Sequence, residues 1–312
     1  MPILKRAIRT MCCATVICTP QLALAETVGL KVDVLDSLIL EGPKIDDLKI
    51  SELSGLAYDR QNAQLIAVSD KGRLFKFALD LTGDRIASLE PLAGHELVDA
   101  DGARIRNSGF NAEGIAMAGD GTLAIVSEHG PRIARFSTDG KWLDDMQVPA
   151  ALSDPAAQRS EKDGLEAVAI HPELGLLTLP EEPLAAEERT THTIHAENGT
   201  TLAFDTTNIG TTSIKGLEVL SDGRIAMIER DVSATDDSLL PFLRILDPAN
   251  CNADRMCETQ VARIDVPGIT DADFEGITQV SDDLILIVSD DKIDSGRRSV
   301  FGLLRFAPAS AG

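Results

Sequence analysis

Three pairs of carboxylates are spaced so that they could form a charged cluster. In each pair, one acid lies near the start of a short apolar run and the other ends the next run: Glu113 with Glu128, Glu166 with Glu181, and Glu275 with Asp290. If the two runs form an antiparallel hairpin, the acids of a pair lie directly opposite each other at its open end. Like charges in that position destabilise a sheet, so each pair requires a metal ion, a shared proton or a basic neighbour.

Calcium is the metal that this chemistry favours. Ca²⁺ takes about six to eight oxygen ligands in acidic, flexible sites, and the chain lacks the Cys and His clusters that bind Zn²⁺. The alternative is a rim of salt bridges, because a basic residue closely follows an acid at four places: Lys71, Arg132, Arg230 and Lys292. The sequence leaves both interpretations open.

The acid pairs belong to an internal repeat. Five segments each contain two short apolar runs around a tight polar turn, and they begin at Leu53, Ala112, Leu165, Lys215 and Phe274. The dipeptides Asp120-Gly121 and Asp222-Gly223 are typical of two-residue hairpin turns, because glycine tolerates positive φ. Further alternating stretches follow each hairpin, so four strands per repeat are expected.

All-β repeats of roughly 50 residues, none of which can bury its own sheet, predict a β-propeller of five or six four-stranded antiparallel blades. The segment from Val32 to Leu40 is expected to pair with the last blade and close the ring. A β-sandwich is the alternative, but it would not predict such regular repeats. If the first strand of each hairpin lines the channel, the acids gather at one end of it. Lys215 in the fourth repeat and Ser54 in the first replace the acid, so the ring is asymmetric.

Composition narrows the choice of ligand. The 312 residues carry a formal net charge of −21, which disfavours binding to a nucleic-acid backbone. Aromatic residues make up 4% of the chain, too few for stacking platforms. Metal ions and small polar ligands remain as candidates.

The N-terminus predicts export. Residues 1–25 combine a basic start, an apolar stretch and an A-x-A site, as in a secretory signal. Cleavage before Glu26 would leave one domain, residues 26–312, in the periplasm or outside the cell, without stable membrane insertion. In that compartment Cys251 and Cys257 are expected to form a disulfide.

Taken together, several motifs resemble the phytase-like family of exported bacterial proteins, often labelled "esterase-like activity of phytase". They are SGLAYD, AVSDKGRLF, AEGIA, VSEHGPRIARF, GLEAVA, KGLEVLSDGRIAMIERD, DFEGI and IVSDDK. The resemblance covers the chain from about Ser54 to Phe306. The resemblance implies a propeller fold, calcium and hydrolysis of phosphomonoesters. Ala167 departs from the family pattern, in which glycine usually follows the acid.

This chemistry gives the candidate residues roles on a small phosphorylated substrate. The expected calcium ligands are Glu113, Glu128, Glu166, Glu181, Glu275 and Asp290. The bases Lys71, Arg132, Arg230 and Lys292 would clamp the phosphate, and Glu229 would take a proton from the attacking water. Two other functions fit the same residues: a non-enzymatic propeller that binds a partner in the cell envelope, and a metal-dependent lactonase or esterase.

Overall fold

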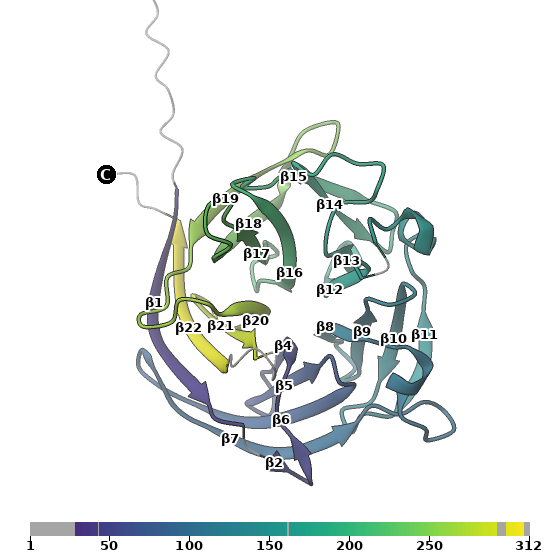
Figure 1. Cartoon of the computed structure of the whole chain (residues 1–312), viewed down its shortest axis with the longest axis vertical. Coiled ribbons are helices and arrows are strands. Elements are labelled where there is room, and N and C mark those ends of the chain that lie inside the picture. Colours follow the sequence, from purple (N-terminus) through teal and green to yellow (C-terminus); the bar gives the residue numbers. More distant parts are fainter. Residues whose placement is uncertain (1–28, 43, 161, 292–297, 309–312) are drawn as a thin grey trace, which may run out of the picture.

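Each sequence repeat folds into a four-stranded antiparallel sheet, and the five sheets form a ring of blades (Figure 1). The computed structural model describes residues 29–42, 44–160, 162–291 and 298–308. The predicted signal at residues 1–25 and the predicted phosphate ligand Lys292 lie outside these ranges. The predicted all-β propeller is confirmed, with five blades.

The blades follow the chain in order. Blade 1 consists of β4 (Leu53–Asp59), β5 (Gln64–Ser69), β6 (Arg73–Thr82) and β7 (Arg85–Glu96). Blade 2 consists of β8 (Ala112–Met117), β9 (Leu123–Ser127), β10 (Arg132–Phe136) and β11 (Trp142–Met146). Blade 3 consists of β12 (Leu165–His171), β13 (Gly175–Pro180), β14 (Thr191–Ala196) and β15 (Thr201–Asp205). Blade 4 consists of β16 (Thr211–Val219), β17 (Ile225–Val232), β18 (Leu239–Cys251) and β19 (Cys257–Arg263).

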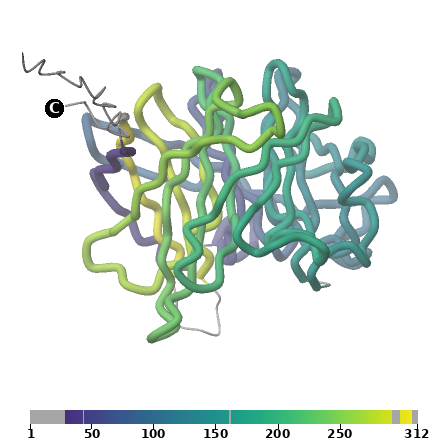
Figure 2. Tube along the Cα trace, turned by 90° about the horizontal axis from the view of Figure 1, so that it is seen from above, coloured from purple at the N-terminus to yellow at the C-terminus, as the bar shows by residue number. Residues whose placement is uncertain are grey.

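Blade 5 joins the two ends of the chain. It consists of β20 (Asp273–Ser281), β21 (Leu284–Asp290), β22 (Ser299–Pro308) and, as its outermost strand, β1 (Leu30–Leu40). The antiparallel pairing of β1 with β22 confirms the predicted closure of the ring. Figure 2 shows the purple and yellow strands side by side. Hydrogen bonds between strands distant in sequence therefore hold the ring shut.

Short elements decorate the ring. The hairpin β2 (Lys44–Ile45) and β3 (Leu48–Lys49) precedes blade 1. Three 3₁₀ turns lie in the linkers after blades 1 and 2: η1 (Ile105–Ser108), η2 (Ala150–Leu152) and η3 (Pro155–Ala157). Within the described ranges, none of the helices has the length and hydrophobicity that crossing a bilayer requires.

The hydrophobic core is divided among the blade interfaces. Five clusters of buried apolar side chains are present, and each contains residues from two neighbouring blades. Phe77 of blade 1 and Phe301 of blade 5, for example, meet edge to face with ring centroids 6.2 Å apart. Each blade thus buries both of its faces only because it has two neighbours, which is why the repeats require a closed ring.

Close approach of the inner strands depends on glycine. A Cβ atom at Gly114 of β8 would lie 2.7 Å from the Cα of Ala167 and 2.8 Å from the carbonyl oxygen of Glu166, both in β12. At Gly216 of β16, it would lie 2.3 Å from the carbonyl oxygen of Glu275 in β20. These neighbours are backbone atoms, so a side chain would push adjacent blades apart.

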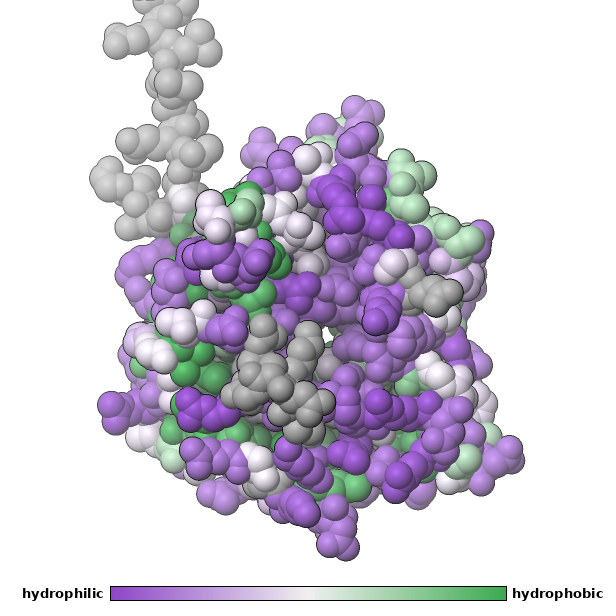
Figure 3. Space-filling model, in the orientation of Figure 1, coloured by the Kyte–Doolittle hydropathy of each residue, from purple (hydrophilic) through white to green (hydrophobic). Residues whose placement is uncertain are grey.

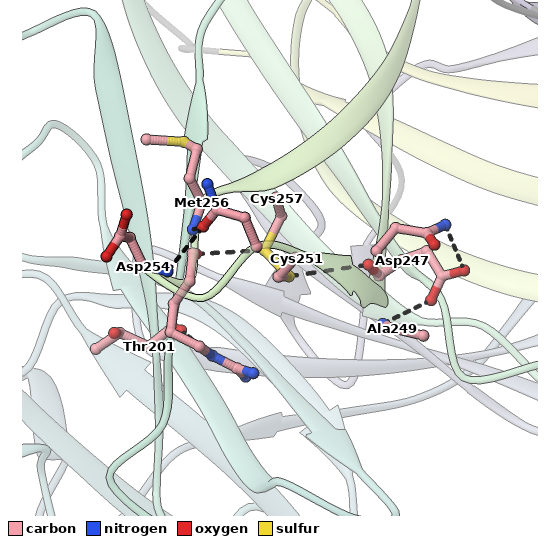
Figure 4. Close-up of a disulfide and its surroundings, with 10 residues drawn as sticks. Thr201, Asp247, Ala249, Cys251, Asp254, Met256 and Cys257 are labelled. Carbon is pink, nitrogen blue, oxygen red and sulfur yellow. Dashed lines mark hydrogen bonds between the residues drawn. A yellow bond between two sulfur atoms is a disulfide. The ribbon is translucent and has the colours of Figure 1, made fainter.

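The predicted disulfide is confirmed. Cys251 and Cys257 are cross-strand partners near the turn between β18 and β19 (Figure 4). The same turn contacts blade 3, because the Arg255 Nε donates to the carbonyl oxygen of Thr201 at 3.3 Å. The disulfide therefore holds a turn that links blades 3 and 4.

Candidate functional site

Every inner strand contains a β-bulge near its start, and the bulge positions carry the candidate residues. The register shifts fall at Ser54 in β4, Glu113 and Gly114 in β8, Glu166 in β12, Lys215 in β16 and Glu275 in β20. A bulged residue has no cross-strand partner, and its side chain is re-aimed relative to the regular alternation. The repeat therefore brings three glutamates, one lysine and one serine to one end of the channel.

The predicted direct opposition of the acids is wrong. Asp290 lies opposite Asp273, two positions before Glu275. Glu128 donates its backbone N–H to the carbonyl oxygen of Asn111, again two positions before the bulged acid Glu113. In each of these hairpins the bulge shifts the register by one residue. A turn with an odd number of residues in blades 2 and 3, or a second bulge in blade 5, shifts the register by one residue more.

The acids nevertheless converge. Asn111 Nδ2 donates to Glu113 at 2.6 Å and to Glu128 at 2.8 Å, and so joins the two carboxylates. We use the term acidic mouth for the cluster at this end of the channel: Glu113, Glu128, Glu166, Glu181, Lys215, Arg230, Asp273, Glu275 and Asp290. Figure 3 shows hydrophilic side chains around the central opening of the ring.

Lys215 lies between carboxylates of blades 3 and 5. Its Nζ is 3.0 Å from Glu181 and 3.4 Å from Glu275, and it also forms an ion pair with Glu166. Only 6% of the side chain is exposed. Burial alone would lower the pKa of Lys215, but Glu166, Glu275 and Glu181 outweigh burial and hold that pKa well above its ordinary value. The ammonium group is therefore a permanent cation within the mouth.

Arg230 is the second cation of the mouth. Its guanidinium donates to Glu181 at 2.8 Å, to Asp273 at 3.1 Å and to Ser213 Oγ at 2.8 Å. Burial lowers the pKa of Arg230, but Asp273 and Glu181 more than offset this effect. Arg230 thus links the second strand of blade 4 to blades 3 and 5.

Carboxylates outnumber the cations in the acidic mouth. Among the described residues, seven carboxyl groups surround the side chains of Lys215 and Arg230. Burial raises the pKa of Glu166 to about 8, even with Lys215 beside it. Burial also raises the pKa of Glu113 well above its ordinary value, and the charges of Glu166 and Glu275 add to this effect. The mouth therefore favours the uptake of protons or of a further cation.

Three of the acids are close enough to share a metal ion. Glu128, Glu166 and Glu181 each offer a carboxylate oxygen, and these oxygens lie within 4.8 Å of one another. Oxygens bound to one Ca²⁺ at about 2.3–2.6 Å can be that far apart. Glu113 lies beside this set, because Asn111 Nδ2 donates to both Glu113 and Glu128. This set of oxygen donors fits a hard cation such as Ca²⁺.

Two predicted catalytic residues pair with residues that do not belong to the mouth. Glu229 is fully buried within blade 4, where it pairs with Arg244 at 2.6 Å and accepts from Thr207. Arg132 pairs with Asp145 of β11 at 3.1 Å and lies over the ring of Phe110. Because Glu229 precedes Arg230 in a strand, its side chain points to the opposite face of the sheet.

Lys71 lies at the blade-1 edge of the mouth. It forms ion pairs with Glu52 and with Asp70, the latter at 3.2 Å. Burial and the neighbouring Glu52 raise the pKa of Asp70 to about 6. Lys71 is therefore the only predicted base for which the predicted local pairing, with Asp70, is confirmed among the described residues.

The residues two positions before each bulge were not among the predicted site residues. Asn111 and Asp273 occupy this position in blades 2 and 5, and Glu52 occupies it in blade 1. In blade 4 it is Ser213, which accepts from Arg230. A polar residue at this position in four of the five repeats was the signal that could have identified them.

Comparison with known proteins agrees with this architecture. The profile of the phytase-like family, described as "Esterase-like activity of phytase", matches residues 49–293. The chain belongs to the phytase-like family. The match includes all five inner strands, and so every bulge position of the mouth. No curated protein sequence matches the chain.

The solved structures that match the chain are distant from it in sequence. A streptogramin B lyase has 9% identity and a TM-score of 0.37, with 90% of this chain and 99% of that one covered. Virginiamycin B lyase from Staphylococcus aureus has 10% identity and a TM-score of 0.42, with coverages of 88% and 99%. A PQQ-bound aldose sugar dehydrogenase from Streptomyces coelicolor has 10% identity and a TM-score of 0.46, with coverages of 90% and 99%. At these values the matches carry no argument about activity.

Proposed function

We propose that the acidic mouth is a calcium-dependent site for the hydrolysis of phosphoric esters in an exported protein. The observation that carries the proposal is the convergence of Glu128, Glu166 and Glu181, in a mouth where carboxylates outnumber cations. Membership of the phytase-like family supports the same chemistry. The predicted signal at residues 1–25 supports export.

The residues divide into metal ligands and substrate ligands. Glu128, Glu166 and Glu181 would hold Ca²⁺, with Glu113 and Asn111 beside them. When bound, the ion would offset the charge of a phosphoryl group and lower the pKa of a coordinated water. Glu275 and Asp290, which were also predicted as ligands, lie on the blade-5 side, where Lys215 contacts Glu275.

Cations at the edge of the mouth would orient the ester. The Arg230 side chain is 16% exposed and that of Lys71 is 26% exposed, so both reach solvent. Guanidinium and ammonium groups donate strongly to phosphate oxygens. Arg230 and Lys71 therefore keep their predicted phosphate-binding role in the proposal, whereas Arg132 loses it.

Glu113 replaces Glu229 as the proposed proton acceptor. Its carboxylate accepts from Asn111 and forms no ion pair within the described part of the chain. Burial raises the pKa of Glu113 well above its ordinary value, so this carboxyl group holds a proton more readily than an exposed glutamate, as a proton acceptor requires. Glu229 cannot serve, because Arg244 and Thr207 occupy its oxygens inside blade 4.

Phosphate release from p-nitrophenyl phosphate and from phytate, with Ca²⁺ and with EDTA, tests the proposal. Glu166→Gln is expected to abolish the calcium-dependent turnover. Glu173→Gln is the matched control, because Glu173 is an exposed acid at the far end of the same hairpin. Absence of metal-dependent turnover in the unmodified protein would refute the proposal. Turnover of lactones alone would assign the site to the lactonase class.

One observation favours a second candidate, a propeller that binds a partner without catalysis. Lys215 already places a cation between the acids of blades 3 and 5. If the ammonium group of Lys215 offsets enough of the repulsion between the acids, the mouth needs no metal ion. Calorimetric titration with Ca²⁺ separates the candidates, since only the first requires a stoichiometric calcium site.

A further inference from the structure

A groove lies beside the acidic mouth, between blades 4 and 5. It is formed where the linker of residues 264–272 passes over the start of β18, and its volume is about 250 Å³. Figure 1 shows this linker running from the outer strand of blade 4 to the inner strand of blade 5. Ile264, Val266 and Phe274 form its buried wall, and the partly exposed Leu239 and Ile269 lie at its opening. The ion pair of Arg263 with Asp265, at 3.3 Å, also lines the groove, so its rim is polar.

Backbone hydrogen bonds fix the shape of the groove. The Ile264 N–H donates to the carbonyl oxygen of Pro241 at 2.9 Å, which ties the start of the linker to β18. The Ile269 N–H donates to the carbonyl oxygen of Val266 at 3.1 Å, in a turn where Gly268 has a φ of +77°. A groove with fixed walls does not have to be ordered when a ligand binds.

The groove shares a wall with the mouth. Asp273, which pairs with Arg230, is followed in β20 by Phe274 of the groove. Pro241, which also lines the groove, is the cross-strand partner of Arg230. Cross-strand partners lie about 4.5–5.5 Å apart and on the same face of a sheet, so the groove begins beside Arg230 at Pro241.

We propose that this groove binds an apolar group of the ester whose charged group lies in the acidic mouth. The inference rests on the proposed ester hydrolysis at the mouth. An apolar cavity of about 150 Å³ accommodates benzene. The groove therefore has room for an aryl ring or an alkyl chain of about six carbons. Short-chain alkyl and aryl phosphates are the substrate class that fits both parts of the site.

The first test is a series of phosphate esters with increasing chain length. Binding of methyl, butyl and hexyl phosphate to the intact protein is measured by calorimetry in the presence of Ca²⁺. Each added methylene is expected to tighten binding by up to about fourfold, because it leaves water for the groove. Equal dissociation constants across the series would overturn the proposal.

A second measurement separates this inference from the proposed function. Hexan-1-ol, which has no phosphate, is titrated while the methyl signals of Ile264 and Ile269 are followed by NMR. Shifts of these signals without any ester turnover would reject hydrolysis and keep the groove as a binding site. Ester turnover, unchanged methyl signals and equal dissociation constants across the ester series would together reject binding in the groove and keep the proposed hydrolysis.

A substitution at Ile269 tests whether the groove causes the gain in affinity with chain length. Ile269→Asp is expected to remove most of the preference for hexyl over methyl phosphate. Leu143→Asp is the matched control, because Leu143 is an exposed apolar residue on β11, the outer strand of blade 2. If Ile269→Asp lowers the melting temperature too far for use, the ester series and the NMR titration of the unmodified protein still decide. An unchanged preference in a folded Ile269→Asp protein would overturn the proposal.

Discussion

Replacement of Lys215 by methionine tests whether its ammonium group holds the acidic mouth together. At 3.4 Å from Glu275, the attraction is about 5 kcal/mol at an effective dielectric constant of about 20. Glu181 and Glu166 add further attraction, while desolvation of the charges opposes it. Removal of one partner from a buried ion pair typically costs about 3–5 kcal/mol, because the remaining charge stays buried. We expect a loss of that size in the free energy of unfolding.

Urea unfolding at pH 7.5 in EDTA measures the effect. With a slope near 3 kcal/mol per molar urea, the midpoint of Lys215→Met should fall by about 1 M or more. Lys141→Met is the control, because Lys141 forms only an exposed pair with Asp139, and its midpoint should barely change. Equal midpoints for Lys215→Met and the unmodified protein would refute the reasoning.

Two additions sharpen this experiment. Calcium should restore part of the loss in Lys215→Met, by about 2.7 kcal/mol when its concentration is about 100 times the dissociation constant. Glu113→Gln should change stability in the opposite direction in EDTA, because burial and the charges of Glu166 and Glu275 destabilise the ionised form of Glu113, which has no ion pair within the described residues. Glu113→Gln should then gain less from calcium than the unmodified protein. A loss of stability in Glu113→Gln at pH 7.5 would contradict the excess of negative charge.

Three further predictions follow from the same structure. Burial raises the pKa of Glu166 to about 8, so its carboxyl group stabilises the fold when protonated, and stability in EDTA should fall as pH rises from about 4.5 to 8. Melting temperatures measured across this pH range check the prediction, and a melting temperature that rises with pH would contradict it. Gly114→Ala should destabilise the protein by about 1–3 kcal/mol, whereas Gly119→Ala, with open space around its Cβ, should not; equal melting temperatures would contradict the close packing of the inner strands. The double substitution of Cys251 and Cys257 by serine should lower stability by about 2 kcal/mol without altering calcium binding, as urea unfolding and calorimetry can check; unchanged stability would show that the turn needs no disulfide.

The fold could be predicted because its signals are local. Alternating apolar residues and turn glycines recur in every repeat, and each repeat became one blade. The extended pattern from Val32 to Leu40 predicted the closing strand, which is observed as β1. The bulges could not be predicted, since a bulge adds one residue without removing the apolar pattern on either side of it.

The residues of the site could be predicted from the sequence, but their ion-pair partners could not. Proximity along the chain suggested that Arg132 neutralises Glu128, but Arg132 opens the third strand of blade 2 and pairs with Asp145 of the fourth. Lys215 was recognised only as a departure from the acid pattern, although it forms three ion pairs with acids from blades 3 and 5. Such pairs depend on the ring, and short-range patterns carry no information about them.

The asymmetry of the five bulges locates the remaining negative charge. Lys215 stands between Glu166 and Glu275, so it offsets charge on the sides of blades 3 and 5. Blade 1 contributes the uncharged Ser54, and Glu113 of blade 2 is met by the neutral amide of Asn111. Glu128 of blade 2 likewise has no lysine or arginine partner within the described residues, and its carboxylate oxygen lies within 4.8 Å of those of Glu166 and Glu181. Among the acids of blades 2 and 3, the negative charge that no lysine or arginine offsets therefore lies on blade 2, beside the paired acids of blade 3. A ring with five identical acids would repel itself on every side, whereas one lysine confines the repulsion to part of the ring, where we expect a divalent cation to stabilise the fold most.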